Sequence, residues 1–343
     1  MSQSRRPSPV NASRHGKNNT LVDNHGRAIT YLRLAITDRC NLRCRYCMPE
    51  TGVESVDHSE TLRYEELKQL VSILLPMGIE KIRITGGEPL VRRGCVDFMK
   101  SLKEDLGVEQ IYLTTNGVEV GRYLPQMKAL GIAGINLSLD TLNSQHYLAI
   151  TRRDFFNRVY QALQEILTAH IPLKINSVVA HWTTDDEILH LAALAQKEAL
   201  TLRFIEHMEF SGNQGEFTHG KEKLFNRIAR LLPDYQEIDQ PDFSTARLFE
   251  HPGFAGKIGI IEGHSRSFCG TCNKIRITPQ GMLKACLYDN GVLDLREMLR
   301  SGVKDQLISC RIQECLEARY ANGRVAQDSC QLNNHQSMAS IGG

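Results

Sequence analysis

Short apolar runs alternate with longer amphipathic stretches from residue 31 onward. Between Tyr64 and Leu75, the residues Leu67, Leu70 and Leu74 share one helical face, as in a helix packed on a core. Repeated pairs of strand and helix are typical of a parallel sheet. The expected strands are Tyr31 to Thr37, Lys81 to Thr85, Gln110 to Thr115, Gly134 to Leu139, Leu173 to Val179 and Leu202 to Ile205.

Six such units predict an α/β fold, either a curved, TIM-like partial (β/α)6 barrel or an open doubly wound sheet. In both folds the loops after the carboxyl ends of the strands gather at one rim. The first strand leads into a cysteine-rich loop, the second into Gly86-Gly87-Glu88-Pro89, and the third into Thr115-Asn116-Gly117. We therefore expect the chemistry of this protein at that rim.

The alternation breaks up after about residue 210. Shorter strand candidates follow at Lys257 to Ile261 and Lys274 to Ile277, and helical segments at Leu293 to Leu299 and Val303 to Tyr320. This change predicts a smaller second module. The expected division is a disordered basic arm at 1–22, a barrel at 23–210, a C-terminal module at 211–330 and a flexible tail at 331–343.

Composition narrows the class of protein. The 343 residues are 41% hydrophobic and carry a formal net charge of +2, which suits a globular core and provides no overall field for nucleic acid. No apolar run approaches the roughly 20 residues that a membrane-spanning helix needs. We expect a cytoplasmic protein that binds neither nucleic acid nor membrane, although the basic arm leaves an organellar address open.

Ten cysteines without a secretory signal favour metal or redox chemistry over a disulfide framework. Six of them fall into two tight groups. The other four show no ligand spacing and are expected to be small apolar residues: Cys95, Cys310, Cys315 and Cys330.

The first group consists of Cys40, Cys44 and Cys47, with gaps of three and two residues. Thiolates are the ligands of iron–sulfur clusters, and a cubane has four irons, so three thiolates leave one iron open. Zinc can take the same spacing and remains an alternative.

The residues around this group resemble the radical S-adenosylmethionine superfamily. The resemblance rests on the segment Asp38 to Cys47, with an aromatic residue before the last cysteine, and on Gly86-Gly87-Glu88-Pro89. It implies a partial barrel of the radical S-adenosylmethionine type and a [4Fe–4S] cluster whose open iron holds the methionine end of S-adenosylmethionine. It places these residues at the cofactor: Tyr46, Gly86, Gly87, Glu88, Thr115, Asn116 and Ser138.

The second group consists of Cys269, Cys272 and Cys286, again three thiolates without an obvious fourth. A structural zinc site normally has four ligands, and His251 or His264 could complete one. A second [4Fe–4S] cluster with an open iron fits the shortfall better, and that iron could bind a nitrogen or oxygen atom of a substrate.

With both groups considered, the chain from about Asn24 to Gly343 resembles the GTP 3′,8-cyclase family, which begins molybdenum-cofactor biosynthesis. The resemblance implies a radical lyase that removes hydrogen from the 3′ carbon of GTP and joins that carbon to C8 of guanine. The product would be (8S)-3′,8-cyclo-7,8-dihydroguanosine 5′-triphosphate. The segments that carry the resemblance are Thr37 to Cys40, Arg83 to Leu90, Asn136 to Asp140, Arg203 to Glu206, Phe268 to Cys269, Cys272 to Asn273 and Ile341 to Gly343.

The family resemblance also implies a substrate site. Arginine can fork onto phosphate oxygens, so basic positions are expected to hold the triphosphate. Gly342, Gly343 and Arg276 are expected to act in catalysis, with the tail entering the active site. The residues expected at the substrate are Arg33, Lys81, Arg83, Lys174, Arg203, Lys274 and Arg276.

Two departures from the family pattern leave GTP open as the substrate. Lys274 stands where an arginine is usual, and the turn from Met208 to Gly212 lacks the common proline. The alternative is a radical enzyme with an auxiliary cluster that acts on another substrate, such as a peptide. The resemblance further implies an electron donor such as flavodoxin or ferredoxin and a downstream cyclic pyranopterin monophosphate synthase, and it leaves a homodimer open.

Overall fold

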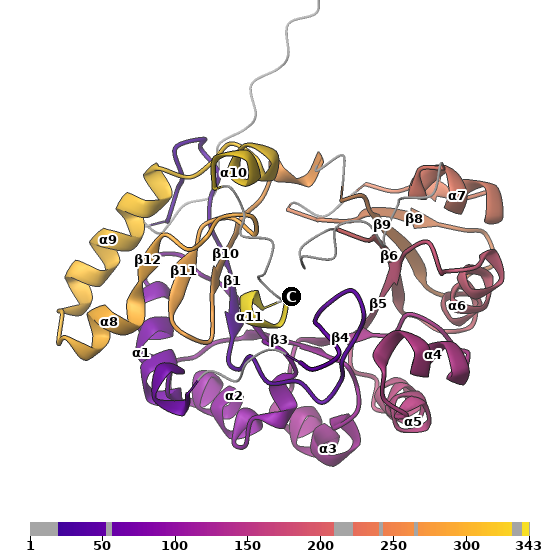
Figure 1. Cartoon of the computed structure of the whole chain (residues 1–343), viewed down its shortest axis with the longest axis horizontal. Helices are drawn as coiled ribbons and strands as arrows, with labels where there is room; N and C mark the ends of the chain where they lie inside the picture. Colours follow the sequence, from indigo (N-terminus) through magenta and orange to yellow (C-terminus); the bar gives the residue numbers. More distant parts are fainter. Residues whose placement is uncertain are drawn as a thin grey trace, which may run out of the picture.

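The computed structural model describes residues 20–52, 57–208, 222–239, 243–263, 267–330 and 338–342. Within these ranges, the strands form one sheet in the order β12-β11-β10-β1-β2-β3-β4-β5-β6-β9-β8-β7. Figure 1 shows the strands as an open arc with helices around its outer side. The arm up to residue 19, the turn at 209–221, the tail at 331–337 and Gly343 lie outside the described residues.

The centre of the sheet is parallel, and neighbours in sequence are neighbours in space. This sequential order is that of a barrel, whereas a doubly wound sheet reverses its order at a switch point. The expected partial barrel is therefore confirmed, as are all six predicted strands within about two residues. They are β1 (Tyr31–Ala35), β2 (Lys81–Thr85), β3 (Gln110–Thr115), β4 (Gly134–Ser138), β5 (Leu173–Val179) and β6 (Thr201–Glu206).

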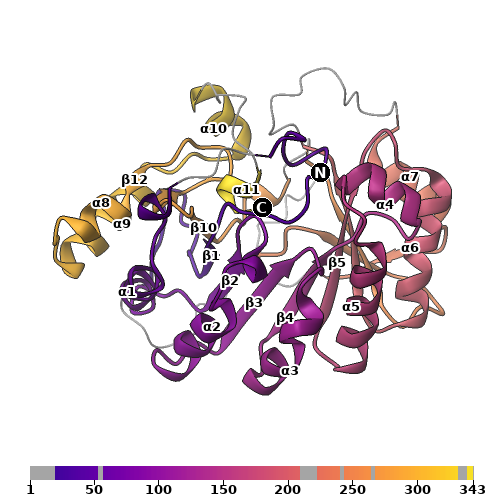
Figure 2. The same cartoon turned by 60° about the horizontal axis from the view of Figure 1, so that its bottom comes forward.

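Helices on the outer side cover the apolar face of these strands, as Figures 1 and 2 show. The predicted stripe Leu67, Leu70, Val71 and Leu74 is fully buried, because it packs on the sheet. The helices are α1 (Tyr64–Leu74), α2 (Cys95–Glu104), α3 (Val120–Leu130), α4 (Ser144–Thr151), α5 (Phe156–Thr168) and α6 (Asp185–Lys197).

The C-terminal third extends the sheet at both edges. Strand β9 (Lys257–Ile261) pairs in parallel with β6, and β10 (Lys274–Ile277) pairs in parallel with β1. Both strands were predicted. That all six central strands lie between them was not predicted, because tertiary contacts decide which strands pair. The division into barrel and module at residue 210 stays a prediction.

The remaining elements flank these two strands. The predicted helix from Leu293 starts two residues later, because Leu293–Asp294 pair with Met282 and Leu283, and Asp294 then caps the helix by accepting from Glu297 N at 2.9 Å. These elements are α7 (Leu224–Leu231), β7 (Gln236–Glu237), β8 (Arg247–Glu250), β11 (Met282–Lys284), β12 (Leu293–Asp294), α8 (Leu295–Arg300), α9 (Asp305–Glu317), α10 (Gly323–Cys330) and α11 (Met338–Ile341).

The described helices include none that combines the length and the apolar character needed to cross a membrane.

A buried carboxylate ties the barrel to the C-terminal elements. Glu66 on α1 accepts from Arg63 N at 2.7 Å and from Arg300 Nε, at the end of α8, at 2.8 Å. Burial raises the pKa of Glu66, but hydrogen bonds from Arg300 and Arg63 outweigh it and hold that pKa at about 2. The ionised form therefore binds its partners much better than the neutral form does.

We expect Glu66→Gln to lower the free energy of unfolding by about 2 kcal/mol at pH 7, because the hydrogen bonds to an ionised group are lost and Arg300 is partly screened by solvent. The pKa of Glu66 is lower in the folded chain than its usual 4.5. Its contribution is therefore complete above pH 4.5 and lost as the pH falls towards 2. Urea denaturation at pH 7, 5 and 4 measures this.

The exposed Glu65 on the same helical turn is the matched control. Glu65→Gln should change the unfolding free energy by less than about 0.5 kcal/mol at each pH. Equal losses for both variants would contradict the assignment of Glu66 as the tie between α1 and α8.

Candidate active site

The first cysteine group lies in a loop that follows β1. Cys40, Cys44 and Cys47 are free thiols and half-buried. Arg43 N and Arg45 N donate to carbonyl groups at the end of α4, both at 3.0 Å, which fixes the loop against that helix. The sequence pattern could predict the loop, but not its docking on α4.

Burial raises the pKa of Cys40 to about 12, and the charges of Cys47 and Cys40 each raise the pKa of Cys44 further. The thiols are therefore close enough to disfavour one another's ionisation. Leu42 N lies 3.4 Å from Cys40 Sγ, and Asn116 Nδ2 lies 3.7 Å from it, as N–H donors to a cluster thiolate would. These residues fit a group that supplies positive charge to several thiolates at once.

The end of β2 lies directly on the backbone that leads into Cys40. Gly87 N donates to Thr37 O at 2.7 Å, and Glu88 N donates to Arg39 O at 2.8 Å. A Cβ atom on Gly86 would lie 2.3 Å from Thr37 O, and one on Gly87 would lie 2.4 Å from Arg39 O. The two glycines are thus required by the chain's own backbone, which is a different reason from the expected approach to a cofactor.

Glu88 joins three strand ends. Its carboxylate is fully buried and accepts from Leu90 N at 3.0 Å, Thr115 Oγ1 at 2.9 Å and Asn116 N at 2.7 Å. Burial raises the pKa of Glu88 to about 7, against these hydrogen bonds, which lower it. The structure brings Glu88, Thr115 and Asn116 together as predicted, and in it Glu88 binds protein donors. A bond from Glu88 to the cofactor's ammonium group stays a prediction.

Tyr46 is positioned by a carboxylate that the sequence placed at the end of the fourth strand and in a family segment, but not among the expected site residues. Its hydroxyl donates to Asp140 Oδ2 at 2.8 Å, and Asp140 Oδ1 accepts from Val178 N at 2.8 Å. Ser138, at the end of β4, is half-buried two residues before Asp140. A carboxylate directly after a predicted strand was the available signal for Asp140.

Basic side chains form a layer on the inner face of the sheet. Arg33 on β1 is in register with Arg83 on β2 and with Arg276 on β10, so these three side chains share one face. Arg203 on β6 is in register with Gly259, where a Cβ atom would lie 2.8 Å from Arg203 Cγ. Gly259 therefore leaves room for Arg203, a function that the sequence did not reveal.

Few opposite charges balance this layer. Burial and, to a smaller extent, neighbouring cations lower the pKa of Lys174 to about 8 and that of Arg203 to about 10. Arg203 Nε and Nη2 are buried without a hydrogen-bond partner in the described part of the chain. Buried, unpaired cations are costly, so the layer is suited to bind a polyanion.

Tyr31 lies among these cations. Arg83 Nε donates to its hydroxyl, Lys81 Nζ lies 4.9 Å from its ring centroid, and Lys274 Nζ lies 5.7 Å from it. Burial raises the pKa of Tyr31, but Arg83, Arg33 and Lys81 outweigh it and bring the pKa to about 7. Sequence reasoning missed Tyr31 because its position beside the cations follows from strand register.

The described end of the chain reaches the same layer. Gly342 O accepts from Arg276 Nη1 at 3.0 Å and from Arg33 Nη2 at 3.3 Å. Gly342 has φ +77, and a Cβ atom there would lie 2.7 Å from the Cβ of Ala35, so only glycine fits. Figure 1 shows α11 inside the arc of strands. The expected partners Gly342 and Arg276 are together, and Gly343 lies outside the described residues.

The second cysteine group lies beside β10 and β11. Gly323 N lies 3.4 Å from Cys269 Sγ, Arg319 Nη2 lies 3.3 Å from Cys272 Sγ, and Cys286 N donates to Asp289 at 2.6 Å. N–H donors to two of the three sulfurs fit a cluster held by these thiolates.

Of the two histidines weighed as zinc ligands, His251 does not join this group in the structure. His251 stacks near Tyr235 and Phe254, beside β8 at the other end of the sheet order, and His264 lies outside the described residues. Within the described ranges, no three Cys, His, Asp or Glu side chains converge as the ligands of one metal ion.

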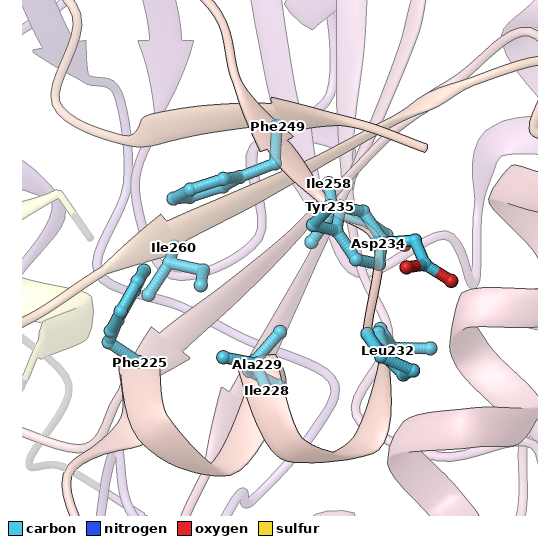
Figure 3. Close-up of a pocket in the computed structure, with 10 residues that line it drawn as sticks. Phe225, Ile228, Ala229, Leu232, Asp234, Tyr235, Phe249, Ile258 and Ile260 are labelled. Atoms are coloured by element: carbon cyan, nitrogen blue, oxygen red, sulfur yellow. The ribbon is translucent and has the colours of Figure 1, made fainter. Parts of the chain in front are cut away.

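A separate cavity of about 220 Å³ lies between α7 and strands β8 and β9. Figure 3 shows its largely apolar lining, which includes Phe225, Ile228, Phe249 and Ile260. It contains none of the predicted site residues, so the candidate active site is the inner face of the sheet with its two cysteine groups.

A parallel partial barrel with a three-cysteine loop after β1 defines an enzyme of the radical S-adenosylmethionine class. Residues 34–195 match the family model of the Radical SAM superfamily, and residues 200–324 match that of Molybdenum Cofactor Synthesis C. The crystal structure of SuiB from Streptococcus suis aligns with a TM-score of 0.59 at 14% identity, over 93% of this chain and 78% of that chain, which shows the fold alone.

Curated relatives give the family. The GTP 3′,8-cyclase of Heliobacterium modesticaldum is 39% identical over 87% of this chain and 93% of its own length, and that of Alkaliphilus metalliredigens is 38% identical over 94% and 100%. Human molybdenum cofactor biosynthesis protein 1 is 40% identical over 83% of this chain, which spans only 45% of that protein. This chain belongs to the GTP 3′,8-cyclase family. A [4Fe–4S] cluster and S-adenosylmethionine are the cofactors of its superfamily.

We expect Gly87→Ala to impair loading of the first cluster, because the new methyl group would collide with the carbonyl oxygens of Arg39 and Asp38 and displace the loop that starts at Cys40. A steric change of this kind costs about 1–3 kcal/mol of stability. Iron analysis after anaerobic reconstitution measures the loading.

Gly121 on α3 is the matched control, since a Cβ atom there would meet only the flexible end of Glu165. Gly121→Ala should load iron like the unchanged protein and fold at least as stably, because alanine favours helices. Normal iron content in Gly87→Ala would show that the loop does not need this close approach.

We expect one tyrosine of the ligand-free protein to ionise near pH 7 and Tyr31→Phe to abolish that signal. The pKa of Tyr31 is lower in the folded chain than its usual 10. Its ionised form therefore contributes stability that is complete above pH 10 and is lost as the pH falls through 7. A titration of tyrosinate absorbance measures the pKa, with Tyr112→Phe as the control that retains the signal. Absence of tyrosinate below pH 9 would refute the lowered pKa of Tyr31.

Proposed function

We propose that this chain cyclises GTP to (8S)-3′,8-cyclo-7,8-dihydroguanosine 5′-triphosphate, the first step of molybdenum-cofactor biosynthesis. The observation that carries the proposal is the basic layer on the inner face of the sheet, between the two cysteine groups. A triphosphate supplies the several negative charges that this layer lacks. The names of the close relatives support the same reaction.

In this proposal the first cluster is held by Cys40, Cys44 and Cys47. When bound, the cluster and S-adenosylmethionine supply a one-electron cleavage that yields a radical able to remove hydrogen from the ribose. Glu88 ties β2 to the loops after β1 and β3, and Asp140 orients the Tyr46 hydroxyl. These buried contacts hold the cofactor-facing loops rigid, which positioning of a reactive intermediate requires.

The triphosphate is held by the basic layer. Arg203 offers two nitrogen donors that have no partner in the described part of the chain. Arg83 and Arg33 lie on the same face of the sheet, on the adjacent strands β2 and β1. Arg276 and Gly342 act next to the nucleotide, since the Gly342 carbonyl accepts from Arg276 and Arg33. Lys274 contributes a single charge where an arginine would make a forked contact.

The second cluster, on Cys269, Cys272 and Cys286, binds the purine in this proposal. Its position beside β10 puts it next to Arg276. Burial lowers the pKa of Arg276, and the charges of Cys272 and Cys286 oppose that shift. An electron donor such as flavodoxin or ferredoxin and a downstream cyclic pyranopterin monophosphate synthase complete the proposal.

The test is an anaerobic reaction of the reconstituted protein with dithionite, S-adenosylmethionine and GTP. We expect mass spectrometry to detect 5′-deoxyadenosine together with an isomer of GTP. Formation of 5′-deoxyadenosine without the isomer would reject GTP as substrate and favour another one, such as a peptide. A protein that binds no iron would reject the radical mechanism.

Arg203→Met should raise the KM for GTP by about 10- to 100-fold, because one charge-assisted phosphate contact is lost. It should leave the thermal stability equal or higher, because a buried guanidinium without partners is removed. Arg230→Gln, on the exposed side of α7, is the control and should change neither. An unchanged KM in Arg203→Met would exclude Arg203 from the triphosphate site.

A further inference from the structure

Two arginines and one aspartate from opposite ends of the sequence form a buried triad. Asp23 Oδ2 accepts from Arg27 Nε at 2.6 Å and from Arg319 Nη1 at 3.0 Å. The exposed fractions of the three side chains are 0% for Asp23, 8% for Arg27 and 3% for Arg319. Figure 1 shows the indigo segment before β1 close to α9 and α10, and Arg319 lies between these two helices in the sequence. None of these residues was selected from the sequence.

The triad holds the backbone of the second cysteine group. Arg27 Nη1 donates to Cys269 O at 2.8 Å, and Arg319 Nη1 donates to Cys272 O at 3.0 Å. Arg319 also donates to Lys274 O at 2.9 Å and to Ala285 O at 2.8 Å. The two guanidinium groups thus fix the carbonyl groups of Cys269 and Cys272. They also fix that of Ala285, the residue before Cys286.

One contact goes beyond the backbone. Arg319 Nη2 donates to Cys272 Sγ at 3.3 Å. Hydrogen bonds to ligand sulfurs and nearby positive charge raise the reduction potential of an iron–sulfur cluster, because both stabilise its more negative, reduced form. A residue that only held the two ends of the chain together would need the contacts to the carbonyl groups, but not the contact to Cys272 Sγ.

Arginine is the residue type that can do all of this. Its planar guanidinium has five N–H donors, and the five acceptors around Arg319 are Asp23 Oδ2, Cys272 O, Cys272 Sγ, Lys274 O and Ala285 O. A lysine ammonium has three donors at one point and cannot reach the whole set. Asp23, which is shared with Arg27, offsets part of the buried positive charge.

We propose that Arg319, held in place by Asp23 and Arg27, is a positioning residue for the second iron–sulfur cluster, which orients Cys272 and tunes the cluster through a hydrogen bond to its sulfur. This inference rests on the second cluster of the proposed function. It adds a role for both ends of the described chain in building that site.

The test uses the full-length chain with Cys40, Cys44 and Cys47 replaced by alanine, so that only the second cluster can load. In this parent, we expect Arg319→Lys to release iron to a chelator about 10- to 100-fold faster. We also expect its cluster to have a more negative reduction potential, because one sulfur hydrogen bond is lost. Circular dichroism melting of the iron-free chains shows whether the variant folds.

Arg300→Lys is the matched control, because Arg300 also holds a carboxylate and backbone carbonyls but lies away from the cysteines. It should change neither iron release nor potential. A folded Arg319→Lys chain with the iron release and potential of the parent would overturn the proposal. Failure of the parent itself to bind iron would reject the second cluster, and this inference with it. The proposal of a first cluster on Cys40, Cys44 and Cys47 would be unaffected.

If Arg319→Lys does not fold, pulsed electron paramagnetic resonance of the parent decides the question. With ¹⁵N-labelled arginine, the guanidinium should show a hyperfine coupling to the reduced cluster. Arg276→Lys and Arg27→Lys identify the source, because the charges of Cys272 and Cys286 act on Arg276 and because Arg27 donates to Cys269 O. The coupling should survive in both variants. A coupling that disappears in either variant, or no coupling at all, would overturn the proposal.

Discussion

The contact between the end of β2 and the backbone before Cys40 constrains everything around the first cysteine group. Because Gly86 and Gly87 have no side chains, the backbone after β2 approaches the backbone of residues 37–39 more closely than any other residue type would permit. That approach places the Glu88 carboxylate under the ends of β2 and β3, where both of its oxygen atoms accept hydrogen bonds. Because the carboxylate is buried, each of these hydrogen bonds is costly to break, and the cysteine loop has one position.

The inner face of the sheet shows the opposite situation, because Arg203 has two buried nitrogen donors without a hydrogen-bond partner in the described part of the chain. Arg33, Arg83, Arg203 and Lys174 crowd one another, and burial and mutual repulsion lower the pKa of Arg33 to about 9. Such an arrangement costs stability in the free protein. It is consistent with a site whose binding partner supplies the missing negative charge, whereas at the second cysteine group Asp23 already offsets one of the two positive charges of Arg27 and Arg319.

Several functional residues lay beyond sequence reasoning for a common reason. Tyr31 and Gly259 act through strand register, and Asp23, Arg27 and Arg319 meet across nearly the whole chain. Their residue types are common and carry no local spacing signal. By contrast, the cysteine groups, the Gly-Gly-Glu-Pro turn and the strand-end polar residues are local patterns, which is why they could be predicted.

The sequence by itself determined the six central strands, their helices and the identity of both cysteine groups, because hydrophobic period and ligand spacing are local properties of a chain. It also indicated that β9 and β10 exist. Only the tertiary structure decided that these two strands lie on opposite sides of the six central strands, that Gly342 reaches Arg33 and Arg276, and that Arg319 reaches Cys272. Contacts between residues distant in sequence depend on how whole elements pack, and no local pattern encodes that packing.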